Sequence, residues 1–176
     1  MPERHVALLR AINLGGHNKL PMADLRALFT DLGCADVRTY IQSGNVVYQP
    51  PKAAGDDFGA RVADAIDQRF GLKVPVIVRR GNRLAELAEK HPLAQPDDSH
   101  KALYVGFLSG PPQGEIDPER SPQDTVQIDG HDLYLRYPQG VARSKLTNAY
   151  LDRALGVVST LRNWRTVQTL AEWAMG

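Results

Sequence analysis

The stretch LLRAINLGGHNKLPMADLRALF, residues 8–29, passes from an apolar segment through a loop with two glycines into a helical pattern. The apolar segment covers residues 5–12, which predicts a strand buried on both faces. From Met22 onward, apolar residues return every three or four positions, and Gly33 is placed to end the resulting helix. The stretch therefore predicts a strand, a glycine loop and a helix in succession.

The next fifty residues continue the alternation of strands and helices. Residues 36–42 alternate apolar and polar side chains and lead through an SGN turn into the apolar VVYQ, which is typical of a β-hairpin. Helical spacing returns over residues 58–70, and a strand follows over residues 74–80, where Pro75 restricts it to a sheet edge or a strand start. The order β-α-β-β-α-β is that of a ferredoxin-like split βαβ unit, so we expect an α+β fold with a ferredoxin-like lobe over residues 1–80.

The second half predicts a smaller α+β lobe over residues 81–176, packed with the first as one compact unit. Its hairpin is the segment TVQIDGHDLYLRY, with Asp129-Gly130 at the turn. Residues 109–123 are rich in proline, glycine and acids, which indicates an exposed loop. The remaining expected elements are a helix capped by Asn82 and running to about Lys90, the strand ALYVGFL, a helix from Ser144 to Gly156 and a last helix opened by Asn163.

Composition narrows the classes of protein to which this chain can belong. It has 176 residues, 43% hydrophobic and 23% charged, as in an ordinary globular protein. A net charge of +1 argues against a dedicated nucleic-acid binder, which carries a clear basic excess. With one cysteine, no leader pattern near Met1 and no apolar run of the roughly 18 residues that a membrane span needs, we expect a cytoplasmic protein without a membrane partner.

Gly15 and Gly16 do not complete a nucleotide-binding motif. The spacing of a Walker loop is missing, and so is the G-x-G-x-x-G pattern of a dinucleotide site. One interpretation is a tight turn in which the glycines supply unusual backbone angles and Pro21 starts the helix. The other is an anion site, because the loop and the strand before it gather cations and hydrogen-bond donors: Arg10, Asn13, Asn18 and Lys19.

Several of the expected helices begin beside cations, although the positive end of the helix dipole disfavours a cation by roughly 0.3–1 kcal/mol. The segment GVARSKLTN is the clearest case, since Arg143, Ser144 and Lys145 all fall near a helix start. Arg162 and Asn163 stand at the start of the last helix in the same way. A bound phosphate or carboxylate would explain the pattern, and so would acidic neighbours elsewhere in the fold.

Other chemistries find little support in the sequence. The five histidines show no metal-ligand spacing, so we expect no metal and name no cofactor. Ser43 lacks the G-x-S-x-G elbow of a serine hydrolase, and Cys34 is expected to be a buried structural thiol. RNA-recognition modules stack bases on aromatic side chains of two adjacent central strands, whereas the first strand here has no aromatic residue, which leaves Tyr40 and Tyr48 of the hairpin.

Three blocks of the sequence resemble the bacterial domain-of-unknown-function 1697 family. They are VALLRAINLGGHNKLPMADLRALFTDLGCADVRTYIQSGNVVYQ at the front, and GVARSKLTN and LGVVSTLRNWRTVQTLAEWA at the back. The resemblance implies a two-lobed α+β fold with a ferredoxin-like N-terminal part, and it carries no established activity. Ala11 and His17 depart from the family pattern. The family's characteristic polar positions match here as Arg10, Asn13, Gly15, Gly16, Asn18, Lys19, Ser43, Gly44, Asn45, Ser144, Lys145, Asn148, Arg162, Asn163 and Trp164.

These observations lead to two competing hypotheses. The first is a domain that binds a small phosphate- or carboxylate-bearing ligand in a cleft between its lobes, with no reaction assigned. In it Arg and Lys would neutralise charge, Ser144 would donate hydrogen bonds, and Asn13 and Asn18 would orient the ligand. The second is an interaction module that binds protein or RNA through its sheet and has no small-molecule site. The residues expected to bind the ligand are Arg10, Asn13, Asn18, Lys19, Arg143, Ser144, Lys145, Arg162 and Asn163.

Overall fold

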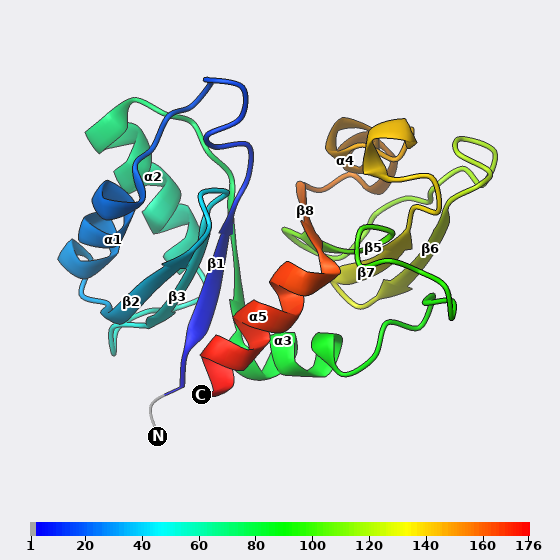
Figure 1. The fold of residues 1–176 in the computed structure, drawn as a ribbon. Helices are drawn as coiled ribbons and strands as arrows, with labels where there is room; N and C mark the ends of the chain where they lie inside the picture. Colours follow the sequence, from blue (N-terminus) through cyan, green and yellow to red (C-terminus); the bar gives the residue numbers. More distant parts are fainter. Residues whose placement is uncertain (1–2) are drawn as a thin grey trace. The chain divides into compact units, whose positions relative to one another are not determined.

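The computed structural model describes residues 3–176, which form a mixed α+β structure (Figure 1). This part of the chain contains two four-stranded antiparallel sheets and five α-helices. It divides into two units. Unit 1 extends to Glu86 and also includes Leu170–Gly176, and unit 2 covers Leu87–Thr169. Each unit contains one of the two sheets.

The first six elements of unit 1 follow in the order β-α-β-β-α-β, as the sequence predicts. The strand order in the sheet is β2-β3-β1-β4, and each neighbouring pair is antiparallel. β1 is therefore a central strand, which explains its near-continuous apolar sequence. β4 is an edge strand that begins directly after Pro75, where proline is tolerated. The bounds are β1 (His5–Leu9), α1 (Met22–Asp31), β2 (Ala35–Tyr40), β3 (Asn45–Gln49), α2 (Phe58–Phe70), β4 (Val76–Arg80) and α3 (Gly81–Ala88).

The core of unit 1 lies between its sheet and the helices α1 and α2, which cover one face of the sheet (Figure 1). α1 turns Leu25, Leu28 and Phe29 toward the sheet, which is the helical spacing expected from the sequence. α2 turns Val62 and Ile66 toward the same core. The position of α1 matters for function because its first turn borders the loop that follows β1.

Tyr48 and Cys34 are both buried in the core of unit 1. The ring of Tyr48 packs against the rings of Phe29 and Phe58, with centroid separations of 5.1 and 5.6 Å. Burial raises the pKa of the Cys34 thiol to about 11, so the expected structural thiol is what the structure contains. A base-stacking surface that uses Tyr48 is excluded, because the side chain has no exposed area.

Unit 2 has a sheet of strand order β6-β7-β5-β8, again with antiparallel neighbours throughout. Leu108, Leu133 and Leu135 of this sheet pack with Leu151 and Leu155 of α4 to form the core. The bounds are β5 (Leu103–Leu108), β6 (Thr125–Asp129), β7 (Asp132–Arg136), α4 (Asn148–Leu155), β8 (Ser159–Asn163) and α5 (Trp164–Met175).

The two units share one strand topology, although the sequence shows no internal repeat. In each unit the strands, numbered by their order in that unit, are arranged 2-3-1-4. A helix directly follows the fourth strand in both, α3 in one and α5 in the other. Equivalent backbone hydrogen bonds lie at the end of the first strand of each sheet. In unit 1, Leu9 N–H donates to Gly44 O and Arg10 N–H to Pro75 O. In unit 2, Leu108 N–H donates to His131 O and Ser109 N–H to Val158 O.

Two of the expected helix starts are wrong. α3 begins at Gly81, so Asn82 lies within the helix and does not cap it. α4 begins at Asn148 and is capped by Thr147, whose Oγ1 accepts the N–H of Tyr150 at 3.2 Å. Ser144 forms a local turn three residues earlier, where its Oγ accepts the N–H of Leu146. Arg143 and Lys145 therefore precede α4 by several residues and do not flank its cap.

The second hairpin and the last helix follow the sequence closely. β6 and β7 pair up to Asp129 and Asp132, so the turn is Gly130-His131, one residue later than expected. The expected cap of the last helix is confirmed, because Asn163 Oδ1 accepts the N–H of Thr166 at 2.9 Å. The segment directly before that helix forms the edge strand β8, where no strand is expected from the sequence.

Candidate functional site

The loop between β1 and α1 is held in an unusual backbone conformation. Two glycines and three other residues of this loop have positive φ angles, which non-glycine residues rarely adopt. Asparagine tolerates this left-handed region better than most residues, so it suits such a loop. The values are +60° for Ala11, +56° for Asn13 and Gly15, +81° for Gly16 and +50° for Asn18.

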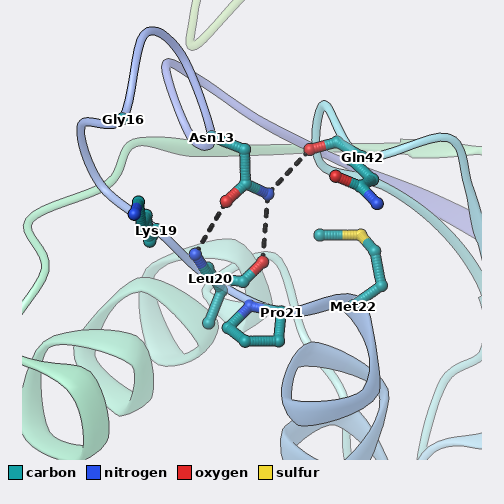
Figure 2. A pocket seen from close by; sticks show the side chains of 7 residues that line it. All are labelled: Asn13, Gly16, Lys19, Leu20, Pro21, Met22 and Gln42. Atoms are coloured by element: carbon teal, nitrogen blue, oxygen red, sulfur yellow. Dashed lines mark hydrogen bonds between the residues drawn. The ribbon is translucent and has the colours of Figure 1, made fainter.

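The side chain of Asn13 connects three parts of unit 1. Its Nδ2 group donates to Leu20 O at 3.0 Å and to Gln42 O at 2.8 Å, and its Oδ1 accepts the N–H of Leu20 at 2.8 Å (Figure 2). The amide thus joins the two ends of the loop to each other and to the turn between β2 and β3. Both Nδ2 hydrogens are used by backbone carbonyls, which makes Asn13 a structural residue of the site.

Asn18 closes the loop from the other side. Its Nδ2 donates to Ala11 O at 3.0 Å, and its carbonyl accepts the N–H of Asn13 at 3.1 Å. A tight turn within the loop is closed by the N–H of His17, which donates to Leu14 O. The two asparagines that were expected to orient a ligand therefore fix the backbone of the loop, and the residues between them stay exposed to solvent.

A pocket of about 470 Å³ opens between this loop and the turn after β2. Of the residues expected at a ligand site, Asn13 and Lys19 line it, while Arg10 and Asn18 belong to the same loop without lining the pocket. The side chain of Lys19 is exposed to solvent. The volume of the pocket lies within the range of small-molecule pockets. The lining residues are Asn13, Gly16, Lys19, Leu20, Pro21, Met22 and Gln42 (Figure 2).

The first turn of α1 opens on this pocket without a side-chain cap. Pro21 occupies the N-cap position with φ −60° and ψ 139°, and no side chain accepts a hydrogen bond from the turn. The backbone N–H of Leu25 donates to Pro21 O and is the first bond of the helix. The three N–H groups before it lack helical partners, which favours a negatively charged group at this end. Asp24 in the same turn supplies part of that negative charge.

Five lining residues are not among the predicted site residues, namely Gly16, Leu20, Pro21, Met22 and Gln42. In the sequence, Gly16 belongs to the glycine pair and to the positions that match the family pattern. Met22 was assigned to the helix by its spacing, and its position at the first helical residue places it at the pocket. Gln42 comes from the β2–β3 turn, and its backbone carbonyl accepts the bond from Asn13. Sequence spacing alone cannot show that Gln42, 29 residues after Asn13, meets this loop.

The predicted site residues of unit 2 lie in two places. The 3-10 turn Val141–Arg143 is followed by Ser144 and Lys145. The cationic side chains of Arg143 and Lys145 are both exposed. The backbone around Lys145 is held by a neighbouring loop, since its N–H donates to Ser121 Oγ and its carbonyl accepts from Arg120. These contacts fix the backbone and leave the ammonium group of Lys145 in solvent.

Arg162 and Asn163 serve the interior of unit 2. The guanidinium of Arg162 is buried, and it donates to Thr160 Oγ1 at 2.8 Å and to Leu161 O at 2.9 Å. Burial lowers the pKa of Arg162 to about 10, which still leaves it charged at neutral pH. Asn163 is occupied as the cap of α5. The expectation that these residues and the β1–α1 loop share one ligand stays a prediction.

Within residues 3–176, no group of three or more His, Cys, Asp or Glu side chains is arranged to hold a metal ion. None of the helices formed by these residues is both long enough and apolar enough to span a membrane.

The fold and the pocket define a two-unit α+β protein whose candidate site lies at a helix start. The family model described as "Protein of unknown function (DUF1697)" matches residues 2–134, and the chain belongs to this family. No curated protein matches the chain. A solved structure, the conserved bacterial protein SP0830 from Streptococcus pneumoniae, is similar over 98% of both chains with a TM-score of 0.62 and 19% identity. At that identity the likeness concerns the fold alone.

Proposed function

We propose that unit 1 binds a small molecule through an anionic group, a phosphate or a carboxylate, in the pocket beside the β1–α1 loop. One observation carries the proposal: the uncapped first turn of α1 borders a pocket that also contains Lys19. Backbone N–H groups at a helix start and a nearby ammonium group together favour an anion. The proposal concerns binding, and no reaction is assigned to the pocket.

Each lining residue has a role in this proposal. Lys19 neutralises the anion, and the N–H groups of the first turn, beginning with Met22, donate hydrogen bonds to it. The side chains of Pro21 and Met22 offer apolar contact for the organic part of the ligand, whereas that of Leu20 is buried in the core. Asn13 keeps the loop, the helix start and the β2–β3 turn together, so that the pocket exists before the ligand arrives.

We further propose that unit 1 is a ferredoxin-like lobe. The β-α-β-β-α-β order, the strand order β2-β3-β1-β4 and the antiparallel pairing support this assignment. A cytoplasmic location is proposed on the cysteine content, since the one cysteine, Cys34, is buried as a free thiol.

A thermal-shift panel tests the binding proposal. The panel contains inorganic phosphate, sulfate, nucleoside monophosphates, sugar phosphates and short dicarboxylates. A ligand at a hundred times its dissociation constant adds about 2.7 kcal/mol, or roughly 5–10 °C for a chain of this size. We expect such a shift for at least one compound, and we expect Lys19→Ala to reduce it. Lys52→Ala removes an exposed lysine outside the pocket and is the matched control.

A second pair of variants tests the helix start directly. Proline is well accepted at the first helical position, so Met22→Pro removes one N–H donor without breaking α1. Met22→Ala removes the same side chain and keeps the N–H group. Binding that is weaker in Met22→Pro than in Met22→Ala supports the proposal. Equal binding by the two variants, or a flat panel with the wild type, contradicts it.

A further inference from the structure

The two units differ in the segment that connects their first and second strands. In unit 1 this connection contains α1, whose Leu25, Leu28 and Phe29 cover the sheet beside β2. In unit 2 the equivalent connection, residues 109–124, contains no helix and no strand. The inner face of the unit 2 sheet beside β6 is therefore covered by a loop in the place where unit 1 has a helix.

A groove of about 510 Å³ lies at this position. Val126 and Ile128 of β6 pair with Leu135 and Leu133 of the core, so their side chains share the inner face of the sheet. The side chain of Ile128 is 45% exposed, which is high for a large apolar residue on the core side of a strand. The groove is lined by Glu115, Ile116, Asp117, Pro118, Ser121, Pro122, Asp124, Thr125, Val126, Ile128 and Leu146.

The groove carries negative charge without a compensating cation among its lining residues. Its three carboxylates belong to Glu115, Asp117 and Asp124, and within residues 3–176 none of them forms an ion pair. Two of them are held in place, because Asp117 accepts the N–H of Glu119 and Asp124 accepts the hydroxyl of Ser121. Apolar side chains and unpaired carboxylates together favour a ligand that is both apolar and cationic.

The nearest cation along this loop is engaged elsewhere. The guanidinium of Arg120 lies 4.7 Å from the ring centroid of Tyr150, and its Nε donates to the carbonyl of Lys145. Tyr150 also contacts the same loop, because its Oη accepts a hydrogen bond from the N–H of Asp117 at 2.9 Å. These contacts shape the wall of the groove and leave its carboxylates available to a partner.

β6 is an edge strand of the unit 2 sheet. Its backbone pairs with β7 on one side, and among residues 3–176 no further strand of this sheet lies beyond it. Four of its five residues, all except Val126, are exposed. Such an edge accepts an added strand through main-chain hydrogen bonds, while neighbouring pockets select the side chains.

We propose that this edge groove binds an extended peptide segment of a partner protein, which adds to the sheet beside β6. On the face toward the groove, the segment would carry apolar residues flanked by lysine or arginine. Its apolar side chains would contact Ile116 and Ile128, and its basic side chains would pair with the three carboxylates. A peptide fits better than a small organic cation, because the groove follows an edge strand and alternate residues of a strand point to one face.

The test uses the full chain and the synthetic peptide acetyl-KTVTVTR-amide, whose lysine, valines and arginine share one face of a strand. In an NMR titration we expect the amide signals of residues 125–129 to shift. The variant Glu115→Gln/Asp117→Asn should bind on the order of fivefold more weakly. Glu89→Gln/Asp97→Asn changes two exposed acids of unit 2 outside the groove and should bind like the wild type. Ile128→Lys should abolish binding, and its spectrum away from β6 shows whether it folds.

Three further peptides separate strand addition with charge pairing from other modes of binding. The peptide acetyl-ETVTVTE-amide reverses the charges and should not bind. Two N-methylated versions of the basic peptide each block one alternating set of amides, and at least one of them should fail to bind. The proposal is overturned if the acidic peptide binds equally well. It is also overturned if both N-methylated versions bind, because a small organic cation would bind without main-chain hydrogen bonds. A third contradicting result is that the β6 amide signals shift only with protein concentration, which would indicate a second copy of the chain.

Discussion

Asn13 shows how a polar residue near a pocket can serve the fold and the site at once. The sequence left two interpretations of the glycine loop open, a tight turn and an anion site. The structure contains the turn, with positive φ angles at Gly15 and Gly16, and it also contains a pocket beside that turn. The amide of Asn13 connects the two, because it fixes the backbone that forms the pocket wall.

Replacing Asn13 should destabilise unit 1. Asn13→Ala removes three hydrogen bonds and places alanine at φ +56°, where its Cβ is unfavourable and no polar side chain compensates. Because each hydrogen bond contributes about 1 kcal/mol, we expect the free energy of unfolding, measured in urea, to fall by about 2–4 kcal/mol. Asn13→Gly loses the same bonds without the backbone strain, so it should be less destabilising than the alanine variant. An alanine variant as stable as the wild type would contradict the assigned role.

Gly44 and Gly16 form a matched pair for the backbone of the site. Both have positive φ, +86° and +81°. A Cβ at Gly44 would lie 2.7 Å from the Cβ of Leu9, whereas a Cβ at Gly16 would meet nothing within 4 Å. We expect Gly16→Ala to cost about 1 kcal/mol from φ alone, and Gly44→Ala to cost clearly more. Equal losses in thermal unfolding would show that the close approach to Leu9 relaxes easily.

At the scale of elements, the cations near helix starts have more than one cause. Beside α3, Arg83 pairs with Glu86 at 3.3 Å and Arg80 pairs with Glu3 at 3.6 Å, so acidic neighbours account for them. Near the end of α4, Asp152 has the unfavourable sign for the helix dipole. It accepts hydrogen bonds from the N–H and the hydroxyl of Ser159 instead, which attach the helix to β8.

The sequence predicted the elements whose signals are local. The two hairpins follow from turn residues within a few positions. The C-terminus of α2 likewise follows from its capping residue Gly71, which has a φ of +67°. The cap of α4 was misplaced because Ser144 and Thr147 are equally good caps in isolation, and only the path of the backbone decides between them. The sequence predicts only the side of the pocket that the β1–α1 loop forms. Gln42 lies on the other side because the pairing of the strands brings the β2–β3 turn next to that loop.

The ion pair between Asp98 and Arg136 makes stability depend on pH. Arg136 Nε lies 2.9 Å from Asp98 Oδ2, and its hydrogen bond to Asp98 holds the pKa of that carboxyl below its usual value. The carboxylate therefore stabilises the fold above its unfolded pKa of about 3.9, and this contribution is lost as the pH falls through the lower folded pKa. Asp98→Asn should cost about 1–3 kcal/mol at pH 7.

Chemical denaturation from pH 7 to pH 2 checks this prediction. The difference between wild type and Asp98→Asn should stay constant down to about pH 4 and shrink below it. Asp97→Asn changes the exposed neighbouring acid and should have little effect at any pH. A difference that is the same at pH 2 and pH 7 would assign the loss to packing and not to charge.

At the scale of the whole molecule, two units with one strand topology carry different candidate sites. In unit 1 the connection between the first two strands contains α1, whose first turn borders the anion pocket. In unit 2 the same connection lacks a helix, and a groove beside an edge strand takes its place. The same topology thus carries the pocket proposed to bind a small anionic ligand in one unit and the groove proposed to bind a peptide in the other.

The last seven residues of the chain should stabilise unit 1. The ring of Trp173 packs against Tyr40 with a centroid separation of 5.4 Å, and the guanidinium of Arg38 lies 3.9 Å from the same ring. We expect Trp173→Ala to cost about 2 kcal/mol and to speed amide exchange in β2. Met175→Ala truncates a side chain that is 60% exposed and is the control. Unchanged exchange in β2 would mean that the tryptophan packing does not support the sheet.

The most direct measurement of the central claim is an NMR titration of the full chain with inorganic phosphate. The account predicts that the amide signals of Gly16, Lys19, Met22 and Ala23 shift together and saturate, and that Lys19→Ala weakens the titration while Lys52→Ala does not. Signals that shift instead in the segment GVARSKLTN, or no saturable shift at any amide of α1, would contradict the assignment of an anion site to unit 1.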